Sequence, residues 1–161
     1  MPIAALMRHG DACAPPVEEL TFDSCEKNIA LFAEVGQTIG RKAIIATSLE
    51  HETMATARVA HAMFDADVFV FPGLSEKGTP KEMDVFVDWL IKQILPVSIF
   101  THRKRVKSFF AALMRITGKT ATKMPGFRYK LFERYPRAIL IDTDTMETKI
   151  VQARRKEKAP P

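Results

Sequence analysis

Two histidines of this 161-residue chain each stand beside an arginine, directly after a short apolar run. Arg8 and His9 follow the first run, and His102 and Arg103 follow a later one. A guanidinium group matches the oxygens of a phosphate, and a neutral imidazole can attack phosphorus and carry the phosphoryl group. A second, protonated imidazole can stabilise the phosphoryl oxygens during the transfer. These residue types indicate phosphoryl transfer through His9; the alternative is two strand ends that carry incidental histidines.

The pattern of apolar runs predicts an α/β fold that would bring these residues together. Runs typical of strands buried on both faces occur at 3–7, 43–47, 68–72, 97–101 and 138–142. Helical spacing of apolar residues falls between them, with helices expected over 21–39, 51–64, 80–94 and 106–118. This alternation predicts a three-layer α/β/α sandwich with a mostly parallel central sheet and one or two antiparallel edge strands near the C-terminus. The carboxyl ends of parallel strands lie at the same end of the sheet, so His9 and His102 are expected side by side.

Composition limits the class of protein. Apolar residues make up 47% of the chain and charged residues 27%, which excludes a wholly disordered chain, a collagen and a coiled coil. No apolar run reaches the roughly 20 residues of a membrane-spanning helix. The two cysteines make neither a disulfide framework nor a zinc site, and the apolar start is too short for a signal peptide. We therefore expect one cytoplasmic domain over 1–153, followed by a polar tail over 154–161.

Positive charge is concentrated in one segment. Residues 103–137 contain eleven lysines and arginines and one acid, Glu133, in a chain of net charge +5. Such asymmetry indicates an anionic substrate or an acidic protein partner, and the alternative is a solvated basic face. Nucleic-acid binding is less well supported, because exposed aromatic residues and a recognition-helix motif are missing.

Four segments carry a resemblance to a known family. The segment LMRHGDA, residues 6–12, resembles the signature of the histidine phosphatase (phosphoglycerate mutase-like) superfamily. The segments at 20–27, 47–57 and 99–106 resemble, in turn, its first helix start, its second motif and its second-histidine segment. The resemblance covers nearly the whole chain and is greatest to the small phosphohistidine phosphatases of the SixA type.

The resemblance implies a residue role for each matching position. His9 matches the nucleophile that becomes phosphohistidine, Arg8 matches a phosphate-binding arginine, and His102 matches the histidine that stabilises the transferring group. Ser48 matches the start of the second motif. We add two substrate-binding candidates from the residues themselves: Gly10 lets the backbone pass close to a ligand, and Arg103 could supply a further charge. The resemblance implies a phosphatase without a metal or other cofactor.

Two positions depart from the family pattern. Glu52 stands where the family has its second arginine, and we expect this carboxylate not to touch a bound anion. Gly73 stands where many relatives have an acid, with Glu76 three residues further on. Of the remaining histidines, His61 is expected in the core, and His51 either faces the phosphate or is structural.

Two functions follow from these observations. The first is a phosphatase that acts through a phosphohistidine on a phosphohistidine protein or on a small phosphorylated substrate. The second is a catalytically weakened anion-binding protein on the same fold, which Glu52 favours. In the first case the basic segment 103–137 would dock an acidic phosphorylated partner.

Overall fold

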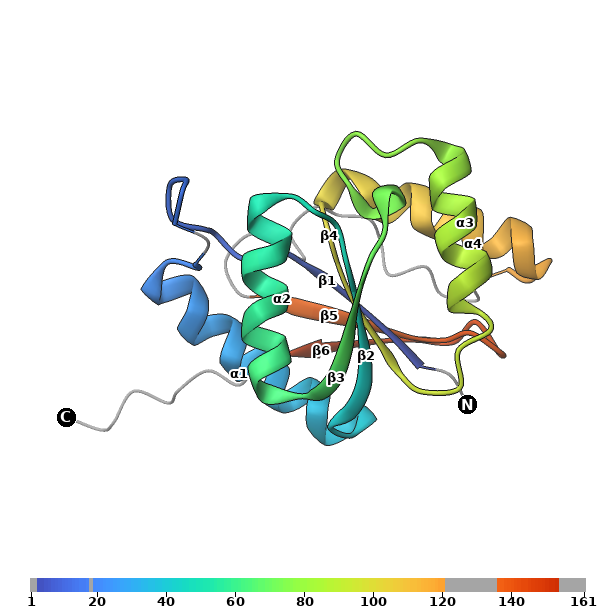
Figure 1. The fold of residues 1–161 in the computed structure, drawn as a ribbon. Coiled ribbons are helices and arrows are strands. Elements are labelled where there is room, and N and C mark those ends of the chain that lie inside the picture. Colours follow the sequence, from blue (N-terminus) through green and yellow to red (C-terminus); the bar gives the residue numbers. More distant parts are fainter. Residues whose placement is uncertain (1–2, 18, 121–135, 154–161) are drawn as a thin grey trace.

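A six-stranded sheet runs through the middle of the structure, a computed structural model that describes residues 3–17, 19–120 and 136–153 (Figure 1). Its strands, in chain order, are β1 Ile3–Arg8, β2 Lys42–Thr47, β3 Asp65–Val70, β4 Val97–Thr101, β5 Arg137–Asp142 and β6 Thr148–Gln152. They are arranged in the order β3-β2-β4-β1-β5-β6. The first four are parallel, β5 runs antiparallel to β1, and β6 runs antiparallel to β5. The predicted mostly parallel sheet with antiparallel strands near the C-terminus is confirmed.

Helices cover both faces of this sheet (Figure 1). The helices α1 Phe22–Ile39 and α2 His51–Met63 pack on one face, and α3 Pro80–Leu90 and α4 Val106–Thr117 pack on the other. The side chains of β1 alternate between the two cores, since Ala5 and Met7 face α1 and α2 whereas Ala4 and Leu6 face α3 and α4. This alternation gives the three layers that the sequence predicts.

Local capping signals set several boundaries. Thr21 caps α1 by accepting a hydrogen bond from the Ser24 N–H, and Gly40 ends that helix with a positive φ of 83°. A capping box between Thr79 and Glu82 starts α3, with a proline at its first position. Gly118 ends α4 in the left-handed conformation. These signals explain why the predicted helix boundaries agree with the structure at these points.

Two expectations about elements are wrong. The third strand covers Asp65–Val70 rather than 68–72, and it is exposed rather than buried, because it is the edge strand and only β2 pairs with it. Helix α2 begins at His51, where the sequence places its start. Helix α3 ends at Leu90, because the turn that precedes Pro96 takes up the residues up to 95, and Ile94 is 90% exposed.

Part of the basic segment, 121–135, and the expected tail 154–161 lie outside the described residues. The short 3₁₀ helices η1 Pro72–Leu74 and η2 Arg103–Arg105 follow β3 and β4 at the edge where the parallel strands end. Among the described helices, none combines the length and the hydropathy that a bilayer-spanning segment requires.

Candidate active site

The imidazoles of His9 and His102 lie next to each other at the carboxyl ends of β1 and β4. The two strands are parallel neighbours in which Arg8 pairs with Thr101, so the next residue of each strand is a histidine. The His9 N–H continues the pairing by donating to the Thr101 carbonyl at 3.2 Å. The ring centroids are 4.7 Å apart with an interplanar angle of 58°. Residues far apart in the sequence thus form one pair at the sheet edge.

The His9 ring is held in the state that a nucleophile needs. Its Nδ1 lies 2.8 Å from the carbonyl oxygen of Gly10, which can only accept, so Nδ1 carries the proton and Nε2 keeps its lone pair. Burial lowers the pKa of His9, and the positive charges of His102 and Arg8 act in the same direction. The Gly10 carbonyl and the Glu52 carboxylate oppose this lowering. The net effect favours an uncharged ring at neutral pH.

The chain after His9 is fixed against two helices. The Gly10 N–H donates to Thr56 Oγ1 of α2 at 2.8 Å, and the Asp11 N–H donates to Ser24 Oγ of α1 at 2.8 Å. A Cβ at position 10 would lie 2.5 Å from Ser24 Oγ and 2.8 Å from Asn28 Nδ2. The close approach that requires glycine here is therefore to α1, and a substrate contact of Gly10 stays a prediction.

Glu50, which the sequence analysis did not single out, lies against His102. One oxygen of its carboxylate contacts His102 Nε2. The same carboxylate accepts hydrogen bonds from Ser75 Oγ at 2.8 Å, from Ser48 Oγ at 3.0 Å and from the Glu76 N–H at 3.0 Å. Partial burial would raise the pKa of Glu50, but the bonds from Ser75 and Glu76 and the charge of His102 hold it below its usual value. Glu50 is therefore an ionised carboxylate beside the second histidine.

The loop after β3 cannot supply an acid at position 73. A Cβ on Gly73 would lie 2.5 Å from the Glu82 carbonyl oxygen and 2.7 Å from the Met83 nitrogen, so a larger side chain does not fit. The Glu76 carboxylate instead pairs with Lys104 Nζ at 2.9 Å on the surface. The carboxylate at the histidine pair comes from Glu50, which immediately precedes α2.

Other predicted site residues take varied positions. Ser48 is fully buried, and its Oγ contacts Thr53 Oγ1 at 2.7 Å and donates to the Glu50 carboxylate, so it helps to hold that carboxylate in place. Arg8 is the last residue of β1 and Arg103 the first of η2, and both are half-buried. The buried Arg105 donates from Nη2 and Nε to the Gly73 carbonyl, at 3.0 and 3.2 Å.

The remaining two histidines have structural contacts. His51 Nε2 donates to the Cys13 carbonyl at 2.8 Å and so ties the loop after β1 to the start of α2. His61 is exposed, with Nδ1 3.0 Å from the Ala66 carbonyl, so the expectation that it lies in the core is wrong. His61 lies in the last turn of α2, at the opposite end of the strands from the histidine pair.

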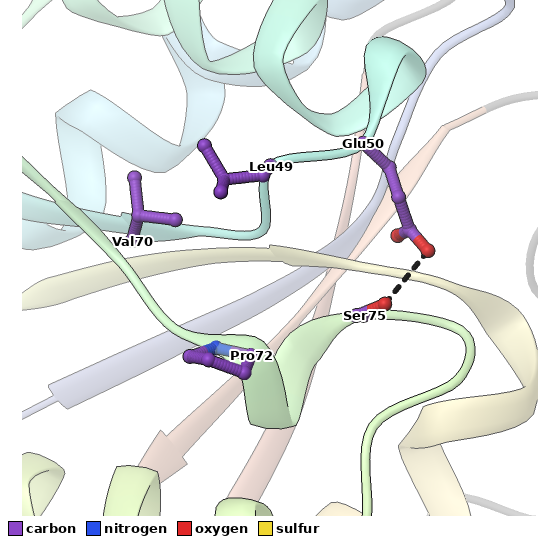
Figure 2. Close-up of a pocket in the computed structure, with 5 residues that line it drawn as sticks. All are labelled: Leu49, Glu50, Val70, Pro72 and Ser75. Atoms are coloured by element: carbon purple, nitrogen blue, oxygen red, sulfur yellow. Dashed lines mark hydrogen bonds between the residues drawn. The ribbon is translucent and has the colours of Figure 1, made fainter.

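A pocket of about 290 Å³ adjoins this site. Figure 2 shows the five residues that line it, which are Leu49, Glu50, Val70, Pro72 and Ser75, together with the hydrogen bond between Glu50 and Ser75. Glu50 is thus shared between the pocket and the histidine pair.

Solved structures with the same fold are histidine phosphatases and their relatives. The chain is similar to a proposed phosphohistidine phosphatase SixA from Nakamurella multipartitia, with a TM-score of 0.62, 14% identity and 93% of each chain covered. A protein histidine phosphatase SixA complexed with tungstate matches with a TM-score of 0.56 and 15% identity, over 94% of this chain and 96% of that one. Phosphoglycerate mutase from Plasmodium falciparum matches with a TM-score of 0.56 and 15% identity, over 99% of this chain and 94% of that one. No family model and no curated protein matches the chain. The chain therefore has the fold that these structures share.

Proposed function

We propose that this protein is a phosphatase of the histidine phosphatase superfamily and that it acts through a phosphohistidine at His9. The observation that carries the proposal is the His9 ring itself. Its Nδ1 is fixed on the Gly10 carbonyl and its centroid lies 4.7 Å from that of His102. This leaves Nε2 as the basic nitrogen of a partly buried, uncharged imidazole beside a second histidine.

The reaction proceeds in two displacements at phosphorus. In the first, the lone pair of His9 Nε2 attacks phosphorus, the bond to the leaving group breaks, and the leaving group departs with the electron pair. In the second, a water oxygen attacks phosphorus and loses a proton to the solvent, and the phosphorus–nitrogen bond breaks to return the lone pair to Nε2. Arg8 and His102 stabilise the phosphoryl oxygens in both steps. The products are the free leaving group and inorganic phosphate.

Glu50 acts in this scheme as a positioning residue. Its ionised carboxylate accepts a hydrogen bond from His102 Nε2 and fixes the orientation of that ring. Because Glu50 is ionised at neutral pH, it does not protonate the leaving group. Substrates whose leaving group departs readily, such as phosphohistidine or a phenol ester, fit this arrangement.

A phosphatase assay with a variant at His9 tests the function. We expect the protein to hydrolyse p-nitrophenyl phosphate or a phosphohistidine peptide, and His9→Ala to lose that activity by at least about 10³-fold, because the nucleophile is gone. Brief incubation with labelled substrate should leave an acid-labile, base-stable phosphoryl group on the native protein alone. His61→Ala is the matched control, since this exposed histidine belongs to the opposite sheet edge, and it should keep full activity. Activity that survives His9→Ala would rule out the mechanism.

A second candidate function is anion binding without turnover. Glu52 favours it, because this carboxylate stands at the position of the family's second arginine and its charge acts on His9. The same experiment separates the two functions. A binder without turnover would take up vanadate or tungstate, with loss of binding in His9→Ala, and would show no hydrolysis of either substrate. Docking of an acidic partner on segment 103–137 remains a proposal, since much of that segment lies outside the described residues.

A further inference from the structure

From the pocket beside Glu50 we infer the substrate class: a phosphate monoester with an uncharged, apolar leaving group that occupies this pocket. The inference rests on the proposed function. The pocket is lined by Leu49, Glu50, Val70, Pro72 and Ser75 and has a volume of about 290 Å³ (Figure 2).

The pocket lies at the same sheet edge as the reacting histidine. Val70, the last residue of β3, is in register with Thr47, the last residue of β2. Leu49 lies two residues after Thr47 in the chain. The carboxyl ends of β2 and β3 therefore place both apolar side chains at the end of the sheet where β4 and β1 also finish, with β2 directly beside β4. Glu50 joins the two regions, because its carboxylate contacts Ser75 in the pocket wall and His102 in the histidine pair. The proposal therefore places the phosphoryl group at His9 and the leaving group on the pocket side of Glu50.

Exposed apolar side chains make the pocket a binding surface for an apolar group. Leu49 is 79% exposed and Val70 is 40% exposed. Covering them with an apolar group removes this surface from water and gives a favourable free energy. A dry cavity of roughly 150 Å³ is enough to hold benzene, so the larger volume here admits a phenyl ring or a short branched chain. The volume of the pocket and its apolar lining therefore both favour an apolar group such as a phenyl ring.

The polar groups of the pocket select against a charged leaving group. Glu50 and Ser75 are hydrogen-bonded to each other, so their polar atoms already have partners. The ionised Glu50 carboxylate would repel a second carboxylate or phosphate on the substrate. Esters with a second anionic group, such as phosphorylated hydroxy acids, are therefore disfavoured. An apolar phenol meets neither obstacle.

Two phosphonates that differ in the group next to phosphorus test this inference without turnover. Benzylphosphonate carries a phenyl ring, and phosphonoacetate carries a carboxylate at the same place. In calorimetric titrations of the native protein, the dissociation constant for benzylphosphonate should be lower than that for phosphonoacetate by about tenfold or more. The benzylphosphonate titration should also show a negative change in heat capacity, which marks the burial of apolar surface.

Substitutions in the pocket test whether its residues cause the preference for benzylphosphonate over phosphonoacetate. Leu49→Ser should reduce the ratio of the two affinities to within about twofold, and Val70→Thr, which keeps the shape of the side chain, should lower it in part. Ile94→Ser is the matched control: Ile94 is an exposed apolar residue that precedes β4, at the edge where the parallel strands begin. This control should keep the ratio of the native protein.

The outcomes separate the pocket from the proposed function. Equal affinities for the two phosphonates, no binding of either, or an unchanged ratio in Leu49→Ser would overturn the inference. A Leu49-dependent preference together with no His9-dependent hydrolysis of phenyl phosphate would retain the pocket and reject the phosphatase. Hydrolysis of phenyl phosphate and of 4-carboxyphenyl phosphate at equal kcat/KM would retain the phosphatase and reject the pocket.

Discussion

At the scale of single residues, the charge at the second histidine distinguishes this site from a simple histidine pair. His102 is buried, and the carboxylate beside it accepts from two serine hydroxyls and a backbone amide. Such a set of donors keeps the Glu50 carboxylate ionised and in one place. Its charge therefore faces His102.

Glu50→Gln tests the importance of that charge. The amide keeps the size of the side chain but removes the negative charge and places an NH₂ group among donors. We expect kcat on p-nitrophenyl phosphate to fall by roughly 10²-fold, a size typical of losing one stabilising electrostatic contact, with a much smaller change in KM. Glu76→Gln is the control, because it leaves the backbone N–H to Glu50 intact and removes only the surface pair with Lys104. Equal kcat values for the two variants would refute the role of Glu50.

The sequence predicts the histidine pair but not Glu50, and the reason is physical. Arg8, His9 and His102 follow predicted strands directly, so the rule for parallel sheets places them at one edge. Glu50 contacts His102 only because Ser75 and Glu76, from the loop after β3, hold its carboxylate. The approach of that loop to the start of α2 depends on tertiary packing, which spacing in the sequence does not encode. The signal available was that Glu50 also follows a predicted strand closely.

At the scale of elements, the packing of η1 against α3 controls the loop that holds Glu50. Gly73 of η1 lies very close to the first turn of α3. A Cβ added at Gly73 would clash with backbone atoms of Glu82 and Met83. Backbone atoms cannot move aside as a flexible side chain can. Ser75 and Glu76 follow within three residues, so a shift at Gly73 is passed to their hydrogen bonds with Glu50.

Gly73→Ala should therefore reduce both stability and activity. We expect a loss of about 1–3 kcal/mol in the free energy of unfolding, measured by urea titration, because the added methyl group forces a backbone displacement. Activity of the folded fraction should fall as well. Gly40→Ala is the control: it has open space around it but a φ of 83°, so it should cost about 1–2 kcal/mol in stability and leave activity unchanged. Unchanged activity of folded Gly73→Ala would contradict the coupling.

At the scale of the whole molecule, the layered fold follows from patterns that local physics enforces. Short apolar runs predict five of the strands, and apolar residues at helical spacing predict all four helices. Capping residues such as Thr21 and Gly118 mark helix ends. The error at β3 arose because an apolar run alone does not tell a central strand from an edge strand. Edge position is a property of the completed sheet.

The stability of the whole molecule should depend on pH through the site. Burial lowers the pKa of His9 from its ordinary value of 6.5, and hydrogen bonds hold the pKa of Glu50 below its ordinary 4.5 despite its partial burial. Each group binds protons more readily in the unfolded chain, so stability is full above these ordinary values and is lost as the pH falls below them. Thermal unfolding between about pH 8 and pH 4 should show a decreasing midpoint, first below about 6.5 and again below about 4.5. His9→Asn should lack part of the first decrease, and an identical pH dependence in that variant would contradict the assignment.

The position of β3 at the free edge of the sheet has an evolutionary consequence. Val70 forms part of the pocket wall, yet its strand is paired on one side only, and its side chains beyond Ala66 are exposed. Substitutions there disturb few core contacts, so they cost little stability while they reshape the surface that a leaving group meets. The histidine pair, in contrast, follows the ends of two central strands, whose changes the core would resist. In the proposed phosphatase, the reaction and the choice of substrate thus belong to parts of one sheet that differ in their tolerance of substitution, so that descendants of this chain can acquire new substrates while they keep the same chemistry.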